Sequence, residues 1–291
     1  MLNFEYQKFS DVLALTKPKI TLMAVLVAAA GLMHAPGQPS VIAWPALASL
    51  LGIAFLVSGS SALNMYLERY VDKKMARTKD RPLPAGRLHA TWALVVACIC
   101  ILGAGILLWS KSNNLTLCLG LLSWVLYVWC YTPLKQKSWV ALIVGSLPGA
   151  MPVMLGYLSW SGEIDAKALA LFLWAFLWQI PHFLAISIFR EQEYTAAGCP
   201  VLSASRGVAF TKKILLLTSW LLVFSTFGLF LSKIIGVGIF CLSLILGAWF
   251  LFICHQGYSS TNTNQWAKRA FKASLLYQSA LFILLIYAAL V

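Results

Sequence analysis

The sequence predicts an all-α polytopic membrane protein with about nine transmembrane helices. Of its 291 residues, 60% are hydrophobic and 11% are charged, and the mean hydropathy is +0.82, whereas soluble domains carry about 25% charged residues. The apolar residues fall into nine runs, and the breaks between the runs are alternately rich and poor in lysine and arginine. Nine spans of about 20 residues with short loops use the whole chain, so we expect a single membrane domain over residues 1–291.

The nine apolar runs define the spans in chain order. The first run is short for a span, and Lys17 and Lys19 at its start can lengthen it by snorkelling. The fifth run predicts a kinked helix, closely packed through Gly145 and Gly149, or alternatively a break that lines a cavity. The runs cover residues 20–33, 41–67, 90–109, 115–131, 139–160, 168–189, 214–231, 234–254 and 273–291.

If the chain has nine spans, most of its basic residues lie in loops on one side of the membrane. That side receives 19 of the 22 lysines and arginines, and the other receives only Lys111, Lys167 and Lys233. Because cytoplasmic loops are enriched in basic residues, we expect a cytoplasmic N-terminus and a periplasmic C-terminus. The net charge of +13 then reflects topology, and no nucleic-acid partner is expected. The two longest loops, 68–89 and 190–213, lie on the cytoplasmic side, which we expect to carry the function.

The cysteines and the N-terminal residues indicate where the protein is located and which kinds of site it lacks. The seven cysteines lie mostly in apolar runs and show neither CxxC spacing nor Cys/His pairs at metal-ligand spacing, which argues against a disulfide framework or a zinc site. Residues 1–19 contain Glu5 and Asp11 and lack an uninterrupted apolar stretch, so they fit neither a secretory nor a mitochondrial presequence. A bacterial inner (cytoplasmic) membrane is the expected location.

An acidic stripe ends the second span. Asn64, Glu68 and Asp72 repeat every four residues, which places them on one helical face over roughly 12 Å. Mg²⁺ prefers oxygen ligands of this kind, completed by substrate phosphates, and basic side chains would hold the rest of a diphosphate. The alternative interpretation is a set of ordinary helix-end charges that form local salt bridges. The basic residues that follow are Lys73, Lys74, Arg77, Lys79 and Arg81.

A second polar cluster ends the sixth span. His182 lies in the string WQIPHF, and Arg190, Glu193 and Tyr194 follow in the next loop. A histidine inside a membrane either forms an interhelical hydrogen bond or contacts a polar or metal-bearing substrate. Both interpretations of His182 are open at this point.

Five strings, in order from about residue 15 to 207, resemble the protoheme IX farnesyltransferase family, a branch of the UbiA superfamily of intramembrane prenyltransferases. The longest has the pattern NxxxExxxDxxMxRTxxRPL, which is the most specific part of the resemblance. The strings are LTKPKI (15–20), NMYLERYVDKKMARTKDRPLPAGR (64–87), YTPLK (131–135), GSLPGAMPVMLGY (145–157), and WQIPHF followed by FREQEYTAAGCPVL (178–202).

The resemblance implies a bundle around a central cavity that opens to lipid, with two acidic motifs at its cytoplasmic mouth. In the first motif, Asn64, Glu68 and Asp72 match as metal ligands and catalytic residues, with Glu68 where the superfamily has aspartate. In the second motif, the superfamily pattern DxxxD meets Phe189 and Glu193, so this chain offers one carboxylate there, and the resemblance implies that Glu193 is a further catalytic residue. The resemblance further implies that the substrates contact Arg77, Lys79, Arg81, Lys135, His182, Arg190 and Tyr194.

The expected activity is transfer of a farnesyl group from farnesyl diphosphate to a vinyl group of heme B, with Mg²⁺ as cofactor and heme O as product. The lipid bilayer is the third expected partner, and a heme A synthase or a terminal oxidase is expected downstream. Two alternatives are a prenyltransferase of the same superfamily acting on a quinone precursor or other aromatic acceptor, and a transporter of an anionic lipid. Transporters often contain repeated halves with paired broken helices, whereas here only the fifth span is interrupted.

Overall fold

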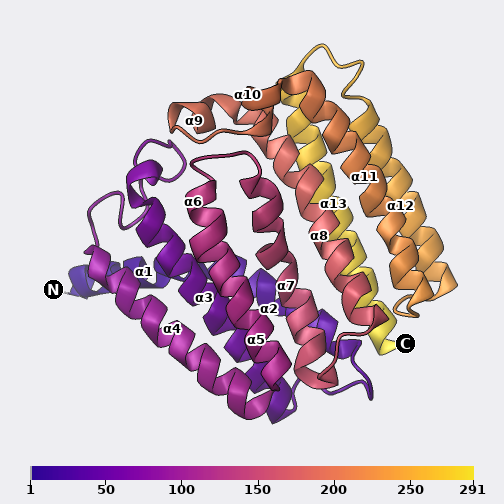
Figure 1. Ribbon diagram of the computed structural model, residues 1–291, viewed down its shortest axis with the longest axis horizontal. Helices are drawn as coiled ribbons and strands as arrows, with labels where there is room; N and C mark the ends of the chain where they lie inside the picture. The colour runs from indigo at the N-terminus through magenta and orange to yellow at the C-terminus, as the bar shows by residue number, and fades with distance from the viewer. Residues whose placement is uncertain (1) are drawn as a thin grey trace.

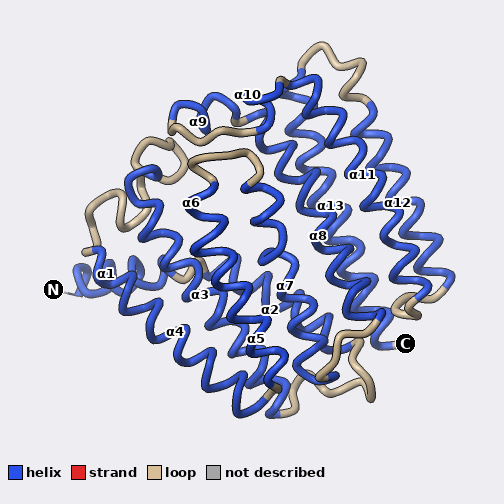
Figure 2. Tube along the Cα trace, viewed as in Figure 1, coloured by secondary structure: helices blue, strands red, loops and turns tan. Residues whose placement is uncertain are grey.

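The computed structural model describes residues 2–291, with side chains from residue 7 onward, and every regular element in this range is helical (Figures 1 and 2). The predicted fold class is therefore confirmed. The elements are α1 (Leu2–Leu15), α2 (Pro18–Met33), α3 (Trp44–Asp72), α4 (Ala90–Lys111), α5 (Asn114–Val125), the π-helix η1 (Leu126–Tyr131), α6 (Thr132–Leu134), α7 (Ala141–Ser161), α8 (Ala166–Phe189), α9 (Glu191–Ala196), α10 (Leu202–Arg206), α11 (Val208–Leu231), α12 (Val237–His255) and α13 (Thr263–Leu290).

Within the described residues, eight helical segments are long and apolar enough to cross a membrane, and a bent pair makes nine. The bent pair joins residues Gln7–Leu15 to α2 at an angle of 44°. Lys17 stands at the bend with a φ of 48°, and Pro18 starts the new helix, where its missing N–H does no harm. The first span, the shortest of the predicted ones, is thus the one that is broken.

Several helices run beyond their apolar runs. The seventh run was expected to begin at residue 214 and the ninth at 273, but α11 starts at Val208 and α13 at Thr263. α3 has 29 residues, or about 44 Å of helix, against a hydrocarbon core of about 30 Å. An apolar run ends at the first charged residues. The helix itself continues past the hydrocarbon into the polar region of the membrane, because its backbone hydrogen bonds do not depend on apolar side chains.

The bundle consists of two groups of helices that meet along α7 and α8 (Figure 1). In the first group α3 packs on α4, and α2 packs on α3 and α7. In the second group α8 packs on α11 and α13, and α12 closes against α11 and α13. A continuous apolar core joins both groups, and its largest fully buried side chains include Tyr157, Trp174, Phe250 and Tyr277.

Glycines allow α2 and α7 to touch backbone to backbone. A Cβ on Gly31 would collide with the Val153 carbonyl, and one on Gly156 would collide with the backbone of Ala28. The close packing expected of the fifth span at Gly145 and Gly149 is also present. Those two glycines pack against the side chains of Tyr131 and Gln179, which a Cβ would overlap.

Candidate active site

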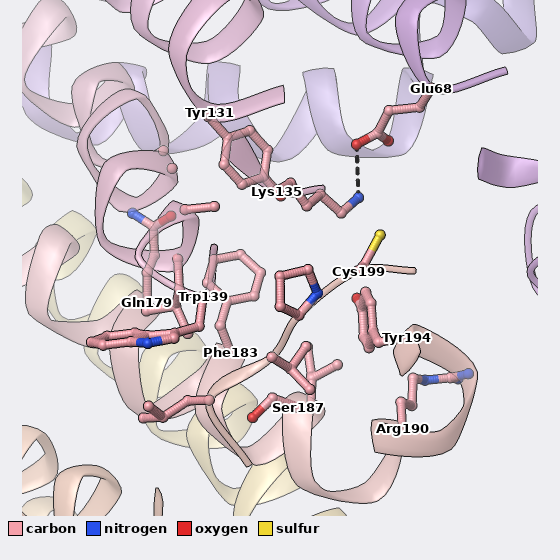
Figure 3. A pocket seen from close by; sticks show the side chains of 18 of the residues that line it. Glu68, Tyr131, Lys135, Trp139, Gln179, Phe183, Ser187, Arg190, Tyr194 and Cys199 are labelled. Carbon is pink, nitrogen blue, oxygen red and sulfur yellow. Dashed lines mark hydrogen bonds and ion pairs between the residues drawn. The ribbon is translucent and has the colours of Figure 1, made fainter. Parts of the chain in front are cut away.

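A cavity of about 560 Å³ lies between the two helix groups, at the end of the bundle that carries the 73–89 and 190–207 loops (Figure 3). Its lining is polar near this end and largely apolar further along α7 and α8. The polar part includes Lys17, Asn64, Glu68, Arg77, Arg81, Lys135, Arg190 and Tyr194, and the apolar part includes Trp139, Leu142, Phe183, Ile186 and Phe271.

Asn64, Glu68 and Asp72 lie on one face of α3, as their spacing predicted, and expose 2%, 4% and 2% of their surface. Each is bound by a cation from another part of the chain. Lys17 Nζ donates to Asn64 Oδ1 at 2.8 Å. Lys135 Nζ donates to Glu68 Oε1 at 2.8 Å (Figure 3), and Arg81 donates to Asp72 Oδ2 at 2.7 Å. Local i to i+4 salt bridges, the alternative interpretation, are not what binds these groups.

The bend between α1 and α2 delivers Lys17 to the site. The left-handed backbone at Lys17 turns the chain before α2 begins. α1 is held next to the 73–89 loop by an ion pair between Arg87 and Asp11 at 3.0 Å. This carboxylate raises the pKa of the Arg87 guanidinium. The pair therefore fixes the segment from which Lys17 extends.

The π-helix η1 delivers Lys135. Pro133 has no N–H for the regular ladder, and the chain around it widens into a π-turn, a form often found at functional sites. Thr132 is tied on both sides: its hydroxyl donates to the Tyr127 carbonyl at 2.8 Å and accepts from Asn64 Nδ2 at 3.0 Å. Burial alone would lower the pKa of Lys135, but the neighbouring Tyr131 and Glu68 outweigh it and raise the pKa, so this lysine stays charged.

The second acidic motif is organised locally. Arg190 donates to Glu193 Oε2 at 2.7 Å, three residues along the chain, and the backbone N–H of Arg77 contacts Glu193 Oε1 at 3.4 Å. Burial acts to raise the pKa of Glu193, and these two donors overcome it and lower the pKa. Glu193 therefore joins α9 to the 73–89 loop. Arg190 and Tyr194 line the cavity, whereas Glu193 lies beside a smaller hollow formed with Lys268.

Two residues expected to contact substrate lie outside the cavity lining. Lys79 is exposed on the 73–89 loop. His182 is buried on α8, where Nδ1 lies 2.9 Å from the hydroxyl of Ser274 on α13 and the ring packs on Trp178 and Phe271. This contact is an interhelical hydrogen bond, the first of the two interpretations of His182 given by the sequence. Asp72 is also outside the lining, although its partner Arg81 belongs to it.

Sequence reasoning did not assign Lys17, Tyr127, Tyr131 or Gln179 to the site, although all four line the cavity. A signal was available for the tyrosines, because Tyr127, Tyr131 and Lys135 recur every four residues. For Lys17 the signal was the proline directly after it, which marks the start of a helix.

The donor set on α3 fits Mg²⁺ that arrives with phosphate. Among the described residues, no group of three or more His, Cys, Asp or Glu side chains is arranged to hold a metal ion. Mg²⁺ typically takes one or two carboxylates and completes its shell with water and phosphate oxygens. Glu68 and Asp72 provide two buried carboxylates, and Asn64 provides an amide oxygen on the same face. All three now accept hydrogen bonds from cations, so a metal ion would have to exchange with them.

The sequence matches the model of the UbiA prenyltransferase family over residues 21–276. It is 36% identical to the protoheme IX farnesyltransferase of Myxococcus xanthus, over 94% of this chain and 92% of that protein. It is 40% identical to the protoheme IX farnesyltransferase of Sorangium cellulosum, over 83% of this chain and 86% of that protein.

Two solved structures have the same fold. One, from a study of digeranylgeranylglyceryl phosphate synthase, has a TM-score of 0.82 at 15% identity and covers 97% of this chain and 99% of its own. The other, a UbiA homologue from Archaeoglobus fulgidus bound to DMAPP and Mg²⁺, has a TM-score of 0.71 at 19% identity and covers 96% and 98%. At these identities the likeness is one of fold.

Proposed function

Because this chain belongs to the UbiA prenyltransferase family, in its protoheme IX farnesyltransferase branch, we propose that it transfers the farnesyl group of farnesyl diphosphate to a vinyl group of heme B, giving heme O and diphosphate. The observation that carries the proposal is the two-part cavity. Its charged mouth suits a metal-bound diphosphate, and its aromatic interior suits a prenyl chain and a flat apolar acceptor.

The diphosphate binds at the mouth. Lys17, Arg81 and Lys135 release the oxygens of α3 and donate to phosphate oxygens instead, and Arg77 and Arg190 add further donors. Their positive charge stabilises the leaving group as its bond to the farnesyl carbon breaks. Mg²⁺, held by Asn64, Glu68 and Asp72, would supply additional positive charge to the same leaving group.

The farnesyl cation is protected inside the cavity. The rings of Trp139, Phe183 and Phe271 line the apolar part and can stabilise a cation through their faces. The surrounding bilayer keeps out bulk water that would otherwise quench the cation. A vinyl group of heme B attacks it, and one water molecule then adds to give a hydroxyethylfarnesyl substituent. His182 supports the wall from behind Phe271.

We place the protein in a bacterial inner membrane with a cytoplasmic N-terminus and a periplasmic C-terminus, so that the charged mouth opens to the cytoplasm. The product would then pass to a heme A synthase or directly to a terminal oxidase. Two reporters are fused to the C-terminus in turn, one that works only in the periplasm and one that works only in the cytoplasm. The periplasmic reporter should be active and the cytoplasmic reporter inactive. Activity of the cytoplasmic reporter would contradict this orientation.

The activity itself is tested with purified protein in lipid nanodiscs, supplied with heme B, farnesyl diphosphate and Mg²⁺. We expect a heme product whose mass has grown by one farnesyl group and one hydroxyl group. A quinone precursor offered as a competing acceptor should remain unmodified. Prenylation of that acceptor with heme left unchanged would overturn the assignment of the acceptor while leaving the prenyl-transfer chemistry in place.

A further inference from the structure

Gln179 presents an unpaired carbonyl oxygen to the apolar part of the cavity. The residue lies on α8 and is 6% exposed. Its Nε2 donates to the backbone carbonyl of Ser146 at 3.0 Å and contacts that of Ala175 at 3.4 Å. Two carbonyl acceptors on one side require the nitrogen to be there, so the amide orientation is fixed. Oε1 accepts no hydrogen bond from the described residues, and Figure 3 shows it turned toward the cavity centre.

The helix opposite leaves space for this oxygen. A Cβ on Gly149 of α7 would overlap Gln179 Oε1, and Gly149 itself lines the cavity. Among the described residues, none of the side chains that line the cavity donates a hydrogen bond to Gln179 Oε1. An acceptor that faces an apolar cavity without a donor is costly, so this position favours a ligand that carries an O–H or N–H group. Water is the smallest such ligand.

We infer that Gln179 Oε1 holds the water molecule that adds to the farnesylated vinyl group. The inference rests on the proposed function. When the vinyl π electrons form the new carbon–carbon bond to the farnesyl carbon, the cation moves to the vinyl carbon next to the porphyrin ring. The water oxygen donates a lone pair to that carbon, a C–O bond forms, and the water loses a proton. The released diphosphate is the base that finally takes up this proton.

The same cation has a competing fate. Without a water in place it loses a proton from the neighbouring CH₂ and becomes an alkene, which is lighter than the hydrated product by one water molecule. Both routes share every step up to the cation. The ratio of the two products therefore reports whether water is held in position, independently of how fast farnesyl diphosphate reacts. Gln179 is on this argument a positioning residue.

The test measures this product ratio for the full-length protein in nanodiscs. Gln179→Leu removes the acceptor, and we expect the alkene-to-hydrated ratio to rise about tenfold, the effect of losing one ordinary hydrogen bond. Gly149→Ala should change the ratio in the same direction, because its Cβ displaces Oε1 while the amide remains. Gln179→Glu should restore hydration, because a protonated carboxyl can donate to Ser146 and present its carbonyl to the cavity. With heavy-oxygen water, the hydrated product should carry the label.

Gln278→Leu is the matched control. Gln278 is a glutamine of the membrane-spanning helix α13 that does not line the cavity, and its product ratio should equal that of the wild type. A Gln179→Leu enzyme that still farnesylates heme with the wild-type ratio would overturn the inference and leave the proposed function standing. A wild-type enzyme that produces no farnesylated heme would instead overturn the proposed function, and this inference with it.

Discussion

The two acidic motifs at the cavity mouth are built differently. On α3, Glu68 and Asp72 are nearly buried, and the cations that bind them come from other segments, Lys135 from beyond η1 and Arg81 from the following loop. In the second motif, the side chain of Glu193 is 20% exposed and pairs with Arg190, three residues away. The first motif is therefore a product of the tertiary fold, and the second is largely a local pair.

This difference suggests different roles for the two motifs. Buried charges on α3 interact strongly and cannot be left unpaired, so any ligand that removes their cations must bring replacement charge. Glu193 lies in a wetter place where an ion pair contributes little. We propose that the α3 oxygens exchange partners when substrate binds, whereas Glu193 holds α9 against the 73–89 loop. Each prediction below tests this division.

The largest effect is expected for Glu68→Gln. The variant keeps the shape of the side chain but loses a metal-binding carboxylate, and it leaves Lys135 without its partner. Turnover measured as diphosphate release should fall about a thousandfold or more, with membrane insertion unchanged. Asp72→Asn should behave alike. Wild-type activity of either variant at saturating Mg²⁺ would refute the assignment of the metal site.

Partner exchange also predicts that Mg²⁺ and diphosphate bind cooperatively. Mg²⁺ alone would leave three cations unpaired, and pyrophosphate alone would leave two buried carboxylates unpaired. Calorimetric titration should show that magnesium pyrophosphate binds more tightly than the separate affinities of Mg²⁺ and pyrophosphate predict, by about 10- to 100-fold. Glu193→Gln should retain this coupling and Glu68→Gln should reduce it. Simply additive affinities would contradict the exchange.

Glu193→Gln should lower activity by no more than about tenfold, mainly through a higher KM for farnesyl diphosphate, because it loosens the position of Arg190 and the contact with the 73–89 loop. The lowered pKa of Glu193 gives a stability that is present above about pH 4.5 and is lost as the pH falls further. Thermal midpoints of wild type and variant should therefore differ at pH 7 and converge in acid. A difference that grows in acid would contradict the ion pair.

The smallest effect is expected for Lys79→Ala. Lys79 is exposed and outside the cavity lining, so kcat/KM should change by less than about twofold. Arg81→Met is its matched partner from the same loop and should be severely impaired, since it leaves Asp72 buried without a cation. Comparable losses in the two variants would show that the whole basic loop binds phosphate, as the sequence alone suggested.

Local patterns in the sequence predicted more than long-range ones did. Hydropathy located the eight long apolar helices and the second half of the bent pair, and four-residue spacing placed Asn64, Glu68 and Asp72 on one face, because both depend only on neighbouring residues. The partners of this face come from 47 and 67 residues away, in Lys17 and Lys135, and no helical period carries such information. The contact between His182 and Ser274 spans 92 residues and was equally hidden.

The cation pairing on α3 also matters while the protein is being made. Lys17 is synthesised before its partner Asn64, and Arg81 is synthesised only nine residues after Asp72. Lys135 is synthesised 67 residues after Glu68. If synthesis pauses between Glu68 and Lys135, α3 is already inserted while the Glu68 carboxylate still lacks its counter-ion. Maturation of α3 therefore waits for η1 and α6 to enter the membrane, and mutations in that segment should reveal themselves first as poor biogenesis.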